Sequence, residues 1–455
     1  MRAPTVKPVR RRTFAPWYDR IKCRPELFFE PATEEQLIEI VRLIRQKGRT
    51  CRVVGAGHSL SDLPCTDDYM IGTDRLDRLI AVDEKTRRVR VQGGMRLSVL
   101  HRHLEKHRLA LSCVGSISDQ SVGGLIATAT HSTGVNYASM STLVTELTMV
   151  TADGELLTCS RTKLPRLFRA ALCSLGCLGI IVRVEFECER AFDLRATEEL
   201  LPMDSVLEQW DSTIRSAEHV RLWWFPHSDR TLVWRASRTD KAMRRAPARS
   251  WFRTRLLGYH LYQGAIYASR ALPALLPAIE RWHVALLHEK PTTMVGPSHR
   301  VFNYDCSMRV WASEWAIPLE HACDALRQIR AMLRQCAFPV YFPIEVRFAA
   351  KDDIWLSPAQ GRAVCYINIS IPRPYRKELP YQQYWREFEA IMRQFNGRPH
   401  WAKTHSLVYE DLVKVYPHLD DFLELRAQLD PAGVFLNAHI RRHLLPSTRK
   451  HHADL

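Results

Sequence analysis

The chain has 455 residues, of which 46% are hydrophobic and 25% charged, so it is long enough for two or three domains with large buried cores. Its 19 glycines, 25 prolines and 12 tryptophans exclude collagen-like, low-complexity and globally disordered chains. The formal net charge of +16 favours anionic partners, which include nucleic acid, an acidic membrane surface and a phosphate-bearing cofactor.

The N-terminal segment is basic. Residues 1–18 contain five basic residues and no acidic residue, but they lack the apolar stretch of an export signal. We therefore expect a solvated basic tail, with a mitochondrial presequence as the alternative.

The 12 cysteines are scattered along the chain, and none forms a C-x-x-C pair. This pattern excludes a zinc ribbon and a dense disulfide scaffold. We interpret the cysteines as reduced thiols in a compartment that faces the cytosol, most of them small core residues. We predict no metal site.

The first half of the chain predicts strands and amphipathic helices. A capping box over Thr33–Gln36 begins a helix that ends at Gly48. The other expected elements are strands over 50–54, 88–92 and 180–188, a helix marked by Leu97, Leu100 and Leu104, and a hairpin over 146–160. After about residue 191 strands alternate with longer helices, so we place a domain boundary there. Residues 237–250 predict an exposed basic loop.

Three glycine-rich stretches carry the functional signal. Gly55-Ala-Gly57-His58-Ser59 follows a strand, but Leu60 replaces the third glycine of the Rossmann fingerprint. The glycine turn without the third glycine can still bind phosphate. The alternative is an ordinary glycine turn that binds no ligand. Residues 115–134 combine glycines with small hydroxyl residues, which allow a backbone to approach a flat or phosphorylated ligand closely. Residues 174–179 lead two glycines into an apolar strand in a similar way.

These stretches and several later ones resemble the sugar-1,4-lactone oxidases of the vanillyl-alcohol-oxidase flavoprotein family, which include L-gulono-1,4-lactone oxidase and D-arabinono-1,4-lactone oxidase. The resemblance covers nearly the whole chain, except for a poorly matching stretch from about 237 to 290. It rests on ordered matches at Gly57-His58-Ser59, Ser121-Val-Gly-Gly124, Thr130-His131, Gly176-x-x-Gly179-Ile-Ile, Trp224-Phe-Pro-His227, Pro343-Ile-Glu345-Val-Arg347-Phe, Asp352-Asp-Ile-Trp-Leu-Ser-Pro358, Gly397-Arg-Pro-His-Trp-Ala-Lys403 and Asp430-Pro-Ala-Gly-Val-Phe-Leu-Asn437.

The resemblance implies a two-domain flavoprotein of the α+β class. After a basic segment over 1–22, residues 23–191 would form an FAD-binding domain of two α+β sub-domains. Residues 192–455 would form a substrate or cap domain on a large antiparallel sheet, with the C-terminal tail returning to the flavin.

The resemblance also implies a covalently bound FAD. His58 matches the histidine that bonds to the flavin 8α carbon, a role that suits an imidazole that is neutral and nucleophilic near pH 7. From the residues alone, a structural loop histidine is the alternative. His131 would either support the flavin or be a satisfied buried histidine. The remaining matches to FAD-binding positions are Val54, Gly55, Ala56, Gly57, Ser59, Gly115, Ser116, Ser118, Asp119, Val122, Gly123, Gly124, Ala127, Ile180 and Ile181.

The candidate catalytic residues are Glu345, Arg347 and Lys403. Glu345 and Arg347 alternate in a strand-like run, so they share one face, and a structural ion pair is the alternative to a catalytic role. The resemblance places both in the substrate pocket, with Lys403 on the returning C-terminal segment.

The implied reaction is oxidation of an aldono-1,4-lactone at C2 to ascorbate or an analogue, with oxygen reduced to hydrogen peroxide. The alternatives are an alditol or sugar oxidase of the same superfamily and a lactone dehydrogenase that uses a carrier such as cytochrome c. Gly115 favours the oxidase, because the family position lies beside the flavin's C4a region and a dehydrogenase relative carries alanine there. A backbone turn with positive φ is the alternative reason for this glycine. A nucleic-acid-binding protein, motivated by the net charge, would need a docking motif that the sequence lacks.

Residues 240–290 predict peripheral membrane association, because basic residues precede an apolar and aromatic stretch. The longest run without charge, Leu256–Ser269, has 14 residues, whereas a span needs about 20. The alternative is a helical insertion packed on the cap domain. Animal members of the family suggest the endoplasmic reticulum and fungal members the mitochondrion. The basic residues are Lys241, Arg244, Arg245, Arg249, Arg253 and Arg255, and the apolar ones are Trp251, Phe252, Leu256, Leu257, Tyr259, Leu261, Tyr262, Ile266 and Tyr267.

Overall fold

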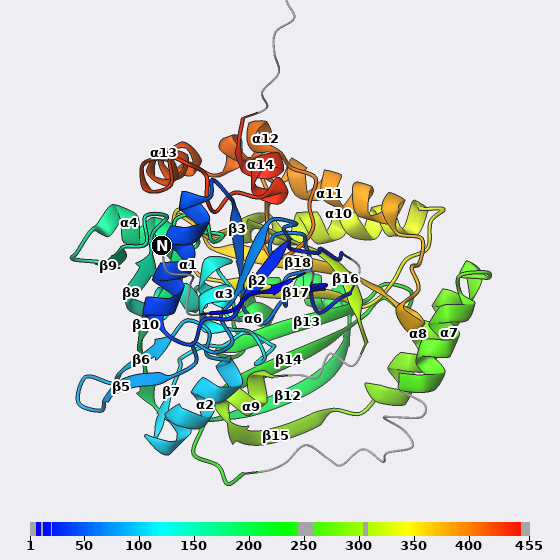
Figure 1. Ribbon diagram of the computed structural model, residues 1–455. Helices are drawn as coiled ribbons and strands as arrows, with labels where there is room; N and C mark the ends of the chain where they lie inside the picture. The colour runs from blue at the N-terminus through cyan, green and yellow to red at the C-terminus, as the bar shows by residue number, and fades with distance from the viewer. Residues whose placement is uncertain (1–5, 11, 20, 244–258, 304–307, 447–455) are drawn as a thin grey trace, which may run out of the picture.

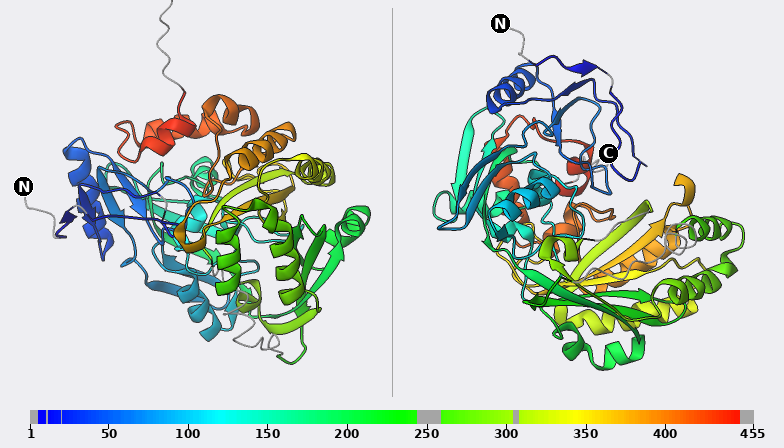
Figure 2. Two further views of the ribbon diagram at one scale, coloured as in Figure 1. Left: turned by 90° about the vertical axis from the view of Figure 1, so that its right-hand side faces the viewer. Right: turned by 90° about the horizontal axis from the view of Figure 1, so that it is seen from below.

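The computed structural model describes residues 6–10, 12–19, 21–243, 259–303 and 308–446 (Figure 1). Mixed parallel and antiparallel sheets are combined with helices along the whole chain, which confirms the predicted α+β class. The N-terminal sheets lie on one side of the molecule, and the largest sheet with its helices lies on the other (Figure 2).

A small four-stranded sheet and helix α1 form the first unit. Its order is β1-β2-β4-β3, with β2, β4 and β3 parallel. The predicted capping box is confirmed, since the Gln36 N–H donates to Thr33 Oγ1 at 3.3 Å and Gln36 Oε1 accepts from the Ala32 N–H at 2.8 Å. The bounds are β1 Val9–Arg10, β2 Leu27–Phe29, α1 Glu34–Gln46, β3 Cys51–Val54 and β4 Tyr69–Gly72.

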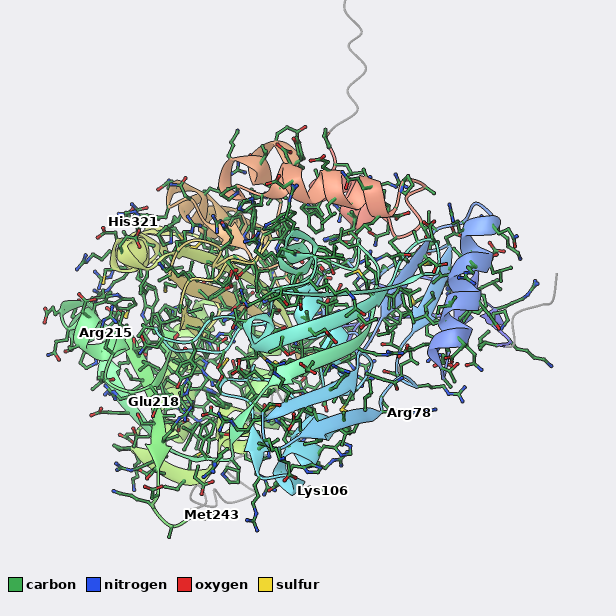
Figure 3. All side chains as sticks on the ribbon, turned by 90° about the vertical axis from the view of Figure 1, so that its left-hand side faces the viewer. Arg78, Lys106, Arg215, Glu218, Met243 and His321 are labelled. Atoms are coloured by element: carbon green, nitrogen blue, oxygen red, sulfur yellow. The ribbon has the colours of Figure 1, made fainter. Side chains whose placement is uncertain are left out.

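A five-stranded antiparallel sheet of order β5-β6-β10-β8-β9 forms the second unit. It contains the strands and the hairpin predicted at 88–92, 146–160 and 180–188. Arg78 and Lys106 lie on the outer surface of this unit (Figure 3). The bounds are β5 Leu79–Asp83, β6 Arg88–Gln92, α2 Leu97–Lys106, β7 Leu109–Ala110, α3 Val122–Ala127, η1 Met140–Leu143, β8 Val144–Val150, β9 Leu156–Ser160, α4 Pro165–Ala171, β10 Ile180–Glu187 and β11 Glu189–Arg190.

The second half is built on an eight-stranded antiparallel sheet of order β15-β12-β14-β13-β17-β18-β16-β19, as the resemblance implies. The boundary predicted near residue 191 falls between β11 and β12. The strands are β12 Asp193–Pro202, β13 His219–Phe225, β14 Arg230–Thr239, β15 Thr292–Pro297, β16 Val310–Pro318, β17 Ile344–Ala349, β18 Val364–Pro372 and β19 Arg398–Pro399. The helices are α5 Met203–Glu208, α6 Trp210–Ile214, α7 Tyr262–Ala268, η3 Pro273–Leu275, α8 Leu276–Leu287, α9 Ser298–Phe302, η4 Leu319–His321, α10 Ala322–Gln335, η5 Pro374–Arg376 and α11 Gln382–Gln394.

The C-terminal segment returns to the first unit; the predicted return of this tail to the flavin stays a prediction. Its helices are α12 Tyr409–Val415, α13 Leu419–Leu429 and α14 Ala438–Leu444. The Cys51 N–H donates to the Val434 carbonyl at 2.7 Å, and the Leu60 N–H donates to the Ala402 carbonyl at 2.6 Å. The strand that precedes the first glycine turn is therefore fixed by the end of the chain.

The N-terminal segment differs from the solvated tail that we expected. Tyr18 is fully buried against Trp311, and the Trp17 N–H donates to the Gly57 carbonyl at 2.7 Å. The guanidinium groups of Arg309 and Arg373 donate to the carbonyls of Trp17 and Tyr18. Residues 14–18 therefore connect the two halves of the molecule, because aromatic side chains there outweigh the basic composition.

The described cysteines are free thiols and most of them are buried, which agrees with their interpretation as reduced core residues. Within the described ranges, no helix has the length and apolar character needed to cross a bilayer.

Candidate active site

Two adjoining cavities form the candidate site, one within the N-terminal half and the other between the two halves of the molecule. One has a volume of about 910 Å³ and is lined by the glycine-rich stretches; we call it the glycine-lined cavity. The other, of about 1490 Å³, is lined by one face of the eight-stranded sheet; we call it the sheet-lined cavity. His58, Gln120 and Ala402 line both, so the two form one continuous cleft.

The glycine-lined cavity is enclosed by the end of β3, the segment around α3 and the turn before β10. Many of the residues predicted to bind a cofactor lie there: Val54, Gly55, Ala56, Gly57, His58, Ser59, Gly123, Gly124, Ala127, Ile180 and Ile181. Gly115, Ser116 and His131 line the sheet-lined cavity instead. Ser121 and Ser174, which belong to the predicted glycine-rich stretches but were not among the predicted cofactor residues, also line the glycine-lined cavity, as do Thr73 and Gly93, which lie outside those stretches.

Three predicted cofactor residues line neither cavity. Ser118 accepts a hydrogen bond from Asn303 Nδ2, and the Asp119 carbonyl accepts one from Arg96 at 2.9 Å. Val122 is fully buried in the core. We interpret these residues as packing that supports the cavity wall. A match to a linear motif does not distinguish such residues from those that line the cavity.

The wall of the glycine-lined cavity requires glycine because atoms of other segments approach its backbone closely. A Cβ on Gly55 would lie 1.8 Å from Ser121 Oγ, and one on Gly93 would lie 2.2 Å from the Ile181 carbonyl oxygen. Gly57 has a φ of +69°, the left-handed region that favours glycine. Successive N–H groups in such a turn form a concave site for an anion such as phosphate.

His58 lies where the two cavities meet. Its Nδ1 atom is buried and has no hydrogen-bond partner in the described part of the chain. Burial lowers the pKa of His58; Asp119 opposes this to a smaller extent and Arg96 adds to it, so the imidazole is neutral near pH 7. The Trp17 ring is stacked beside it, with centroids 6.1 Å apart. A neutral histidine with an unpartnered buried nitrogen fits covalent attachment of a flavin.

The floor of the sheet-lined cavity is a row of side chains on adjacent strands. Trp223 on β13 is opposite Glu345 on β17, and Glu345 is opposite Asn368 on β18. Asn368 is in turn opposite Glu314 on β16. Directly opposed residues point to the same side of a sheet, and Arg347 shares that side two positions beyond Glu345. The predicted shared face of Glu345 and Arg347 is therefore confirmed.

Glu314 is the centre of a buried ion-pair network that the sequence analysis missed. Its carboxylate is 1% exposed and accepts a hydrogen bond from Arg347 Nη2. Lys403 Nζ lies 3.8 Å from Glu314 Oε2, and His131 Nε2 lies 3.3 Å from Oε1. Burial alone would raise the pKa of Glu314, but Arg347, His131 and Lys403 outweigh it and hold the pKa well below its ordinary value.

The ion pair between Glu345 and Arg347, which the sequence left as the alternative to a catalytic role, is only one contact of the network around Glu314. Arg347 Nε lies 3.6 Å from Glu345 Oε2, a longer contact than the one that Arg347 makes with Glu314. Asn368 Nδ2 donates to Glu345 Oε2 at 3.4 Å. Glu345 is thus held on the cavity floor while Glu314 neutralises most of the neighbouring positive charge.

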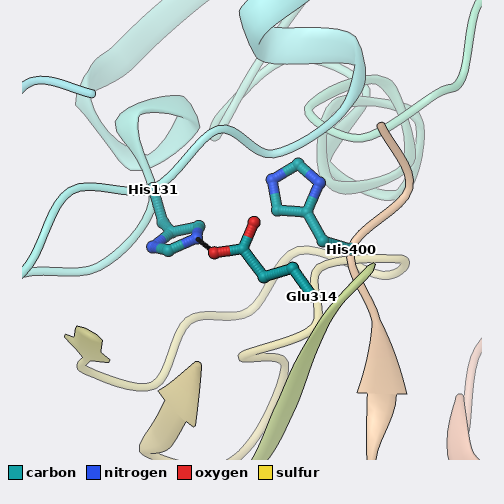
Figure 4. A group of neighbouring side chains, drawn as sticks. All are labelled: His131, Glu314 and His400. Atoms are coloured by element: carbon teal, nitrogen blue, oxygen red, sulfur yellow. Dashed lines mark ion pairs between the residues drawn. The ribbon is translucent and has the colours of Figure 1, made fainter. Parts of the chain in front are cut away.

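His131, Glu314 and His400 bring potential metal-ligand atoms within 4.8 Å of one another (Figure 4). Arg347 and Lys403 already approach the same carboxylate, so a metal cation there would face two positive charges. Burial lowers the pKa of His400 to about 3, and the His131 ring is stacked on Tyr366 with centroids 3.5 Å apart. His131 Nδ1 also contacts the Ser132 carbonyl at 2.9 Å. We interpret the group as part of the surroundings of the Glu314 ion pairs, in which His131 is buried, places Nε2 3.3 Å from Glu314 Oε1 and also lines the sheet-lined cavity.

Comparison with known proteins gives matches over nearly the whole chain. The sequence matches the D-arabinono-1,4-lactone oxidase family over residues 184–443 and an FAD binding domain over residues 25–160. L-gulonolactone oxidases from Scyliorhinus torazame and Mus musculus are each 38% identical, covering 94% of this chain and 97% of the relative. An L-gulono-1,4-lactone dehydrogenase from Mycobacterium tuberculosis is 33% identical, covering 94% of this chain and 98% of the relative. Cholesterol oxidase from B. sterolicum shares the fold, with a TM-score of 0.81 at 16% identity over 98% of this chain and 99% of that chain.

Replacing Glu314 by glutamine should destabilise the protein, because Arg347 and Lys403 would lose their shared carboxylate in a buried site. We expect the free energy of unfolding to fall by about 3 kcal/mol, measured by urea denaturation. Glu320→Gln, at an exposed position on η4, is the matched control and should leave stability unchanged. If the two variants were equally stable, the interactions of Glu314 with Arg347 and Lys403 would not stabilise the fold.

Proposed function

The chain belongs to the D-arabinono-1,4-lactone oxidase family, and from that membership we propose that it oxidises the C2 hydroxyl of an aldono-1,4-lactone such as L-gulono-1,4-lactone. The observation that carries this proposal is the position of Glu345, Arg347 and Lys403 on a cavity that meets the glycine-lined cavity at His58. The FAD-binding domain would hold FAD, whose chemistry would supply the two-electron acceptor for the C2 hydride, with oxygen as the final electron acceptor and hydrogen peroxide as its product.

The charges of the sheet-lined cavity suit a polar, neutral substrate. Arg347 and Lys403 provide donors for the lactone's carbonyl and hydroxyl oxygens and would stabilise negative charge that develops on them. Glu345 accepts the proton of the C2 hydroxyl, because Glu314 is already occupied by cations. The product, a 2-keto lactone, then enolises to ascorbate or an analogue.

Variants Glu345→Gln, Arg347→Ala and Lys403→Ala should each lose turnover by roughly 10²-fold or more while keeping their flavin, because each removes a contact made in the transition state. Steady-state oxygen consumption with L-gulono-1,4-lactone measures the first effect, and the flavin absorbance of the purified variant measures the second. Near-normal turnover in all three would support a purely structural ion-pair network.

We propose that His58 forms the covalent bond to FAD, and that Gly55, Gly57 and Ser59 hold the pyrophosphate. The neutral imidazole and the unpartnered Nδ1 atom support this assignment. Acid-precipitated protein should therefore retain its flavin and fluoresce on a denaturing gel, whereas His58→Ala should release the flavin into the supernatant. His321→Ala, which changes an exposed histidine, is the control. Complete release of flavin from the unchanged protein would contradict the bond.

We propose that oxygen, and not a carrier protein, accepts the electrons, and Gly115 supports this choice. This residue lines the sheet-lined cavity. The alternative reason for this glycine, a turn with positive φ, is wrong, since Gly115 is not among the residues with positive φ. A Cβ at this position would lie 3.0 Å from Thr130 Cγ2, so one methyl group would crowd a tightly packed wall.

Gly115→Ala should slow reoxidation by oxygen while leaving reduction by lactone near normal, and an artificial electron acceptor should restore turnover. Stopped-flow absorbance measures the two half-reactions separately. An unchanged oxygen rate in a stable, flavin-loaded variant would remove Gly115 from control of oxygen access.

We also propose peripheral association with an anionic intracellular membrane, that of the endoplasmic reticulum or the mitochondrion. The α7–α8 hairpin lies at the right-hand edge of Figure 1, and Leu272 and Leu275, in the segment that joins the two helices, are 61% and 40% exposed. Exposed Tyr375 on η5 contacts Tyr267 with ring centroids 5.6 Å apart, and Arg270 and Arg376 are exposed beside them. Leu261 and Tyr267 on the same hairpin are also exposed.

Part of the membrane contact predicted over residues 240–290 is revised. Ile266 is fully buried and Tyr262 lines the sheet-lined cavity, so both belong to a hairpin packed on the cap domain rather than to a lipid contact. Residues 244–258 lie outside the described residues, and with them most of the predicted basic cluster and Trp251, Phe252, Leu256 and Leu257.

The double variant Leu272→Ser/Leu275→Ser should bind phosphatidylserine-containing vesicles at least about tenfold more weakly than the unchanged protein at low salt, because less apolar surface can be buried. Vesicle co-sedimentation measures the partition. Leu156→Ser, which changes an exposed leucine on β9, should bind normally. Failure of the unchanged protein to bind these vesicles would contradict the membrane proposal.

A further inference from the structure

We propose that Tyr262 and His283, on the α7–α8 hairpin, distinguish aldonolactones by the length of their hydroxylated side chain. The inference rests on the proposed function and adds to it the part of the site that sets substrate choice. Both residues belong to the stretch from about 237 to 290 that matches the family poorly, so the motifs did not point to them.

Both side chains line the same cavity as Glu345 and Arg347. The rings of Tyr262 and His283 have centroids 4.4 Å apart, and each lies 6.1 Å from the ring of Phe342. Trp223, directly opposite Glu345 on the neighbouring strand, continues the cavity floor towards β14, away from β16 and its Glu314. The cavity therefore has a charged region at Glu314, Arg347 and Lys403, and an aromatic wall made by the hairpin and its neighbours.

The hairpin is fixed on the sheet by a buried carboxylate. Glu280 lies one helical turn before His283 on α8 and is fully buried. It accepts hydrogen bonds from the His227 N–H at 3.1 Å and the Ser228 N–H at 2.7 Å, in the turn that joins β13 to β14. The Tyr375 N–H donates to Gln263 Oε1 at 3.0 Å, which holds α7 next to Tyr262. Tyr262 and His283 therefore have defined positions, as discrimination between similar ligands requires.

The chemistry of this wall matches a short polyol. Phenol and imidazole groups exchange hydrogen bonds with hydroxyl groups, and aromatic faces cover the carbon atoms between them. L-gulono-1,4-lactone carries one more hydroxymethylene unit in the chain outside the ring than D-arabinono-1,4-lactone, and the two lactones also differ in configuration at C3. With the reacting end of either lactone at Glu345, Arg347 and Lys403, the longer side chain reaches the hairpin, and the shorter one makes fewer contacts there.

Steady-state kinetics on the two lactones test the inference with Tyr262→Phe, His283→Ala and the exposed control His260→Ala. We expect kcat/KM for L-gulono-1,4-lactone to fall about tenfold in each of the first two variants, mainly through KM, because a hydrogen bond to the side chain is lost. The value for D-arabinono-1,4-lactone should change much less, and the control should match the unchanged enzyme. Tyr262→Phe keeps the ring and so preserves the packing of the hairpin, and a thermal melt of each variant checks that it does.

An equal fall on both lactones, or no change on either, overturns the role of the hairpin while the proposed function stands. An unchanged enzyme that oxidises neither lactone contradicts the proposed function itself.

Discussion

The buried carboxylate of Glu314 joins the two halves of the molecule. His131 reaches it from the FAD-binding half, Arg347 from β17, two strands away across β18, and Lys403 from the segment that returns from the C-terminus. A lone carboxylate at this depth would favour its neutral form, but the surrounding cations keep it charged. The charge balance of the substrate cavity thus depends on three segments far apart in the sequence.

The cofactor site depends on a different constraint, the close approach of backbones. Gly55, in the turn after β3, leaves room for the Ser121 side chain before α3, and Gly93, after β6, lets its backbone approach the Ile181 carbonyl on β10. Hydrogen bonds from Trp17 to Gly57 and from Leu60 to Ala402 then fix the loop that carries His58 from both ends of the chain. His58 is consequently positioned by the fold as a whole, even though its motif is local.

Local patterns predicted much of this arrangement. The capping box at Thr33, the strands around β6 and β10, and the shared face of Glu345 and Arg347 follow from residue spacing alone. Glu314, Asn368 and Trp223 could not be placed in this way, because their row depends on the order β13-β17-β18-β16, which joins strands that are not consecutive. A glutamate in the middle of the apolar strand β16 was the one available signal. The contacts of Tyr18 likewise depend on partners hundreds of residues away. The basic composition of the N-terminal segment alone predicted that it would be exposed to solvent.

The central claim is that this cleft transfers electrons from an aldonolactone, through its flavin, to oxygen. Anaerobic mixing of the purified protein with L-gulono-1,4-lactone or D-arabinono-1,4-lactone, followed by admission of oxygen, tests it most directly. The account predicts that lactone bleaches the flavin absorbance and that oxygen restores it with equimolar hydrogen peroxide. A flavin that stays oxidised with both lactones, in a fully loaded and folded protein, would contradict it.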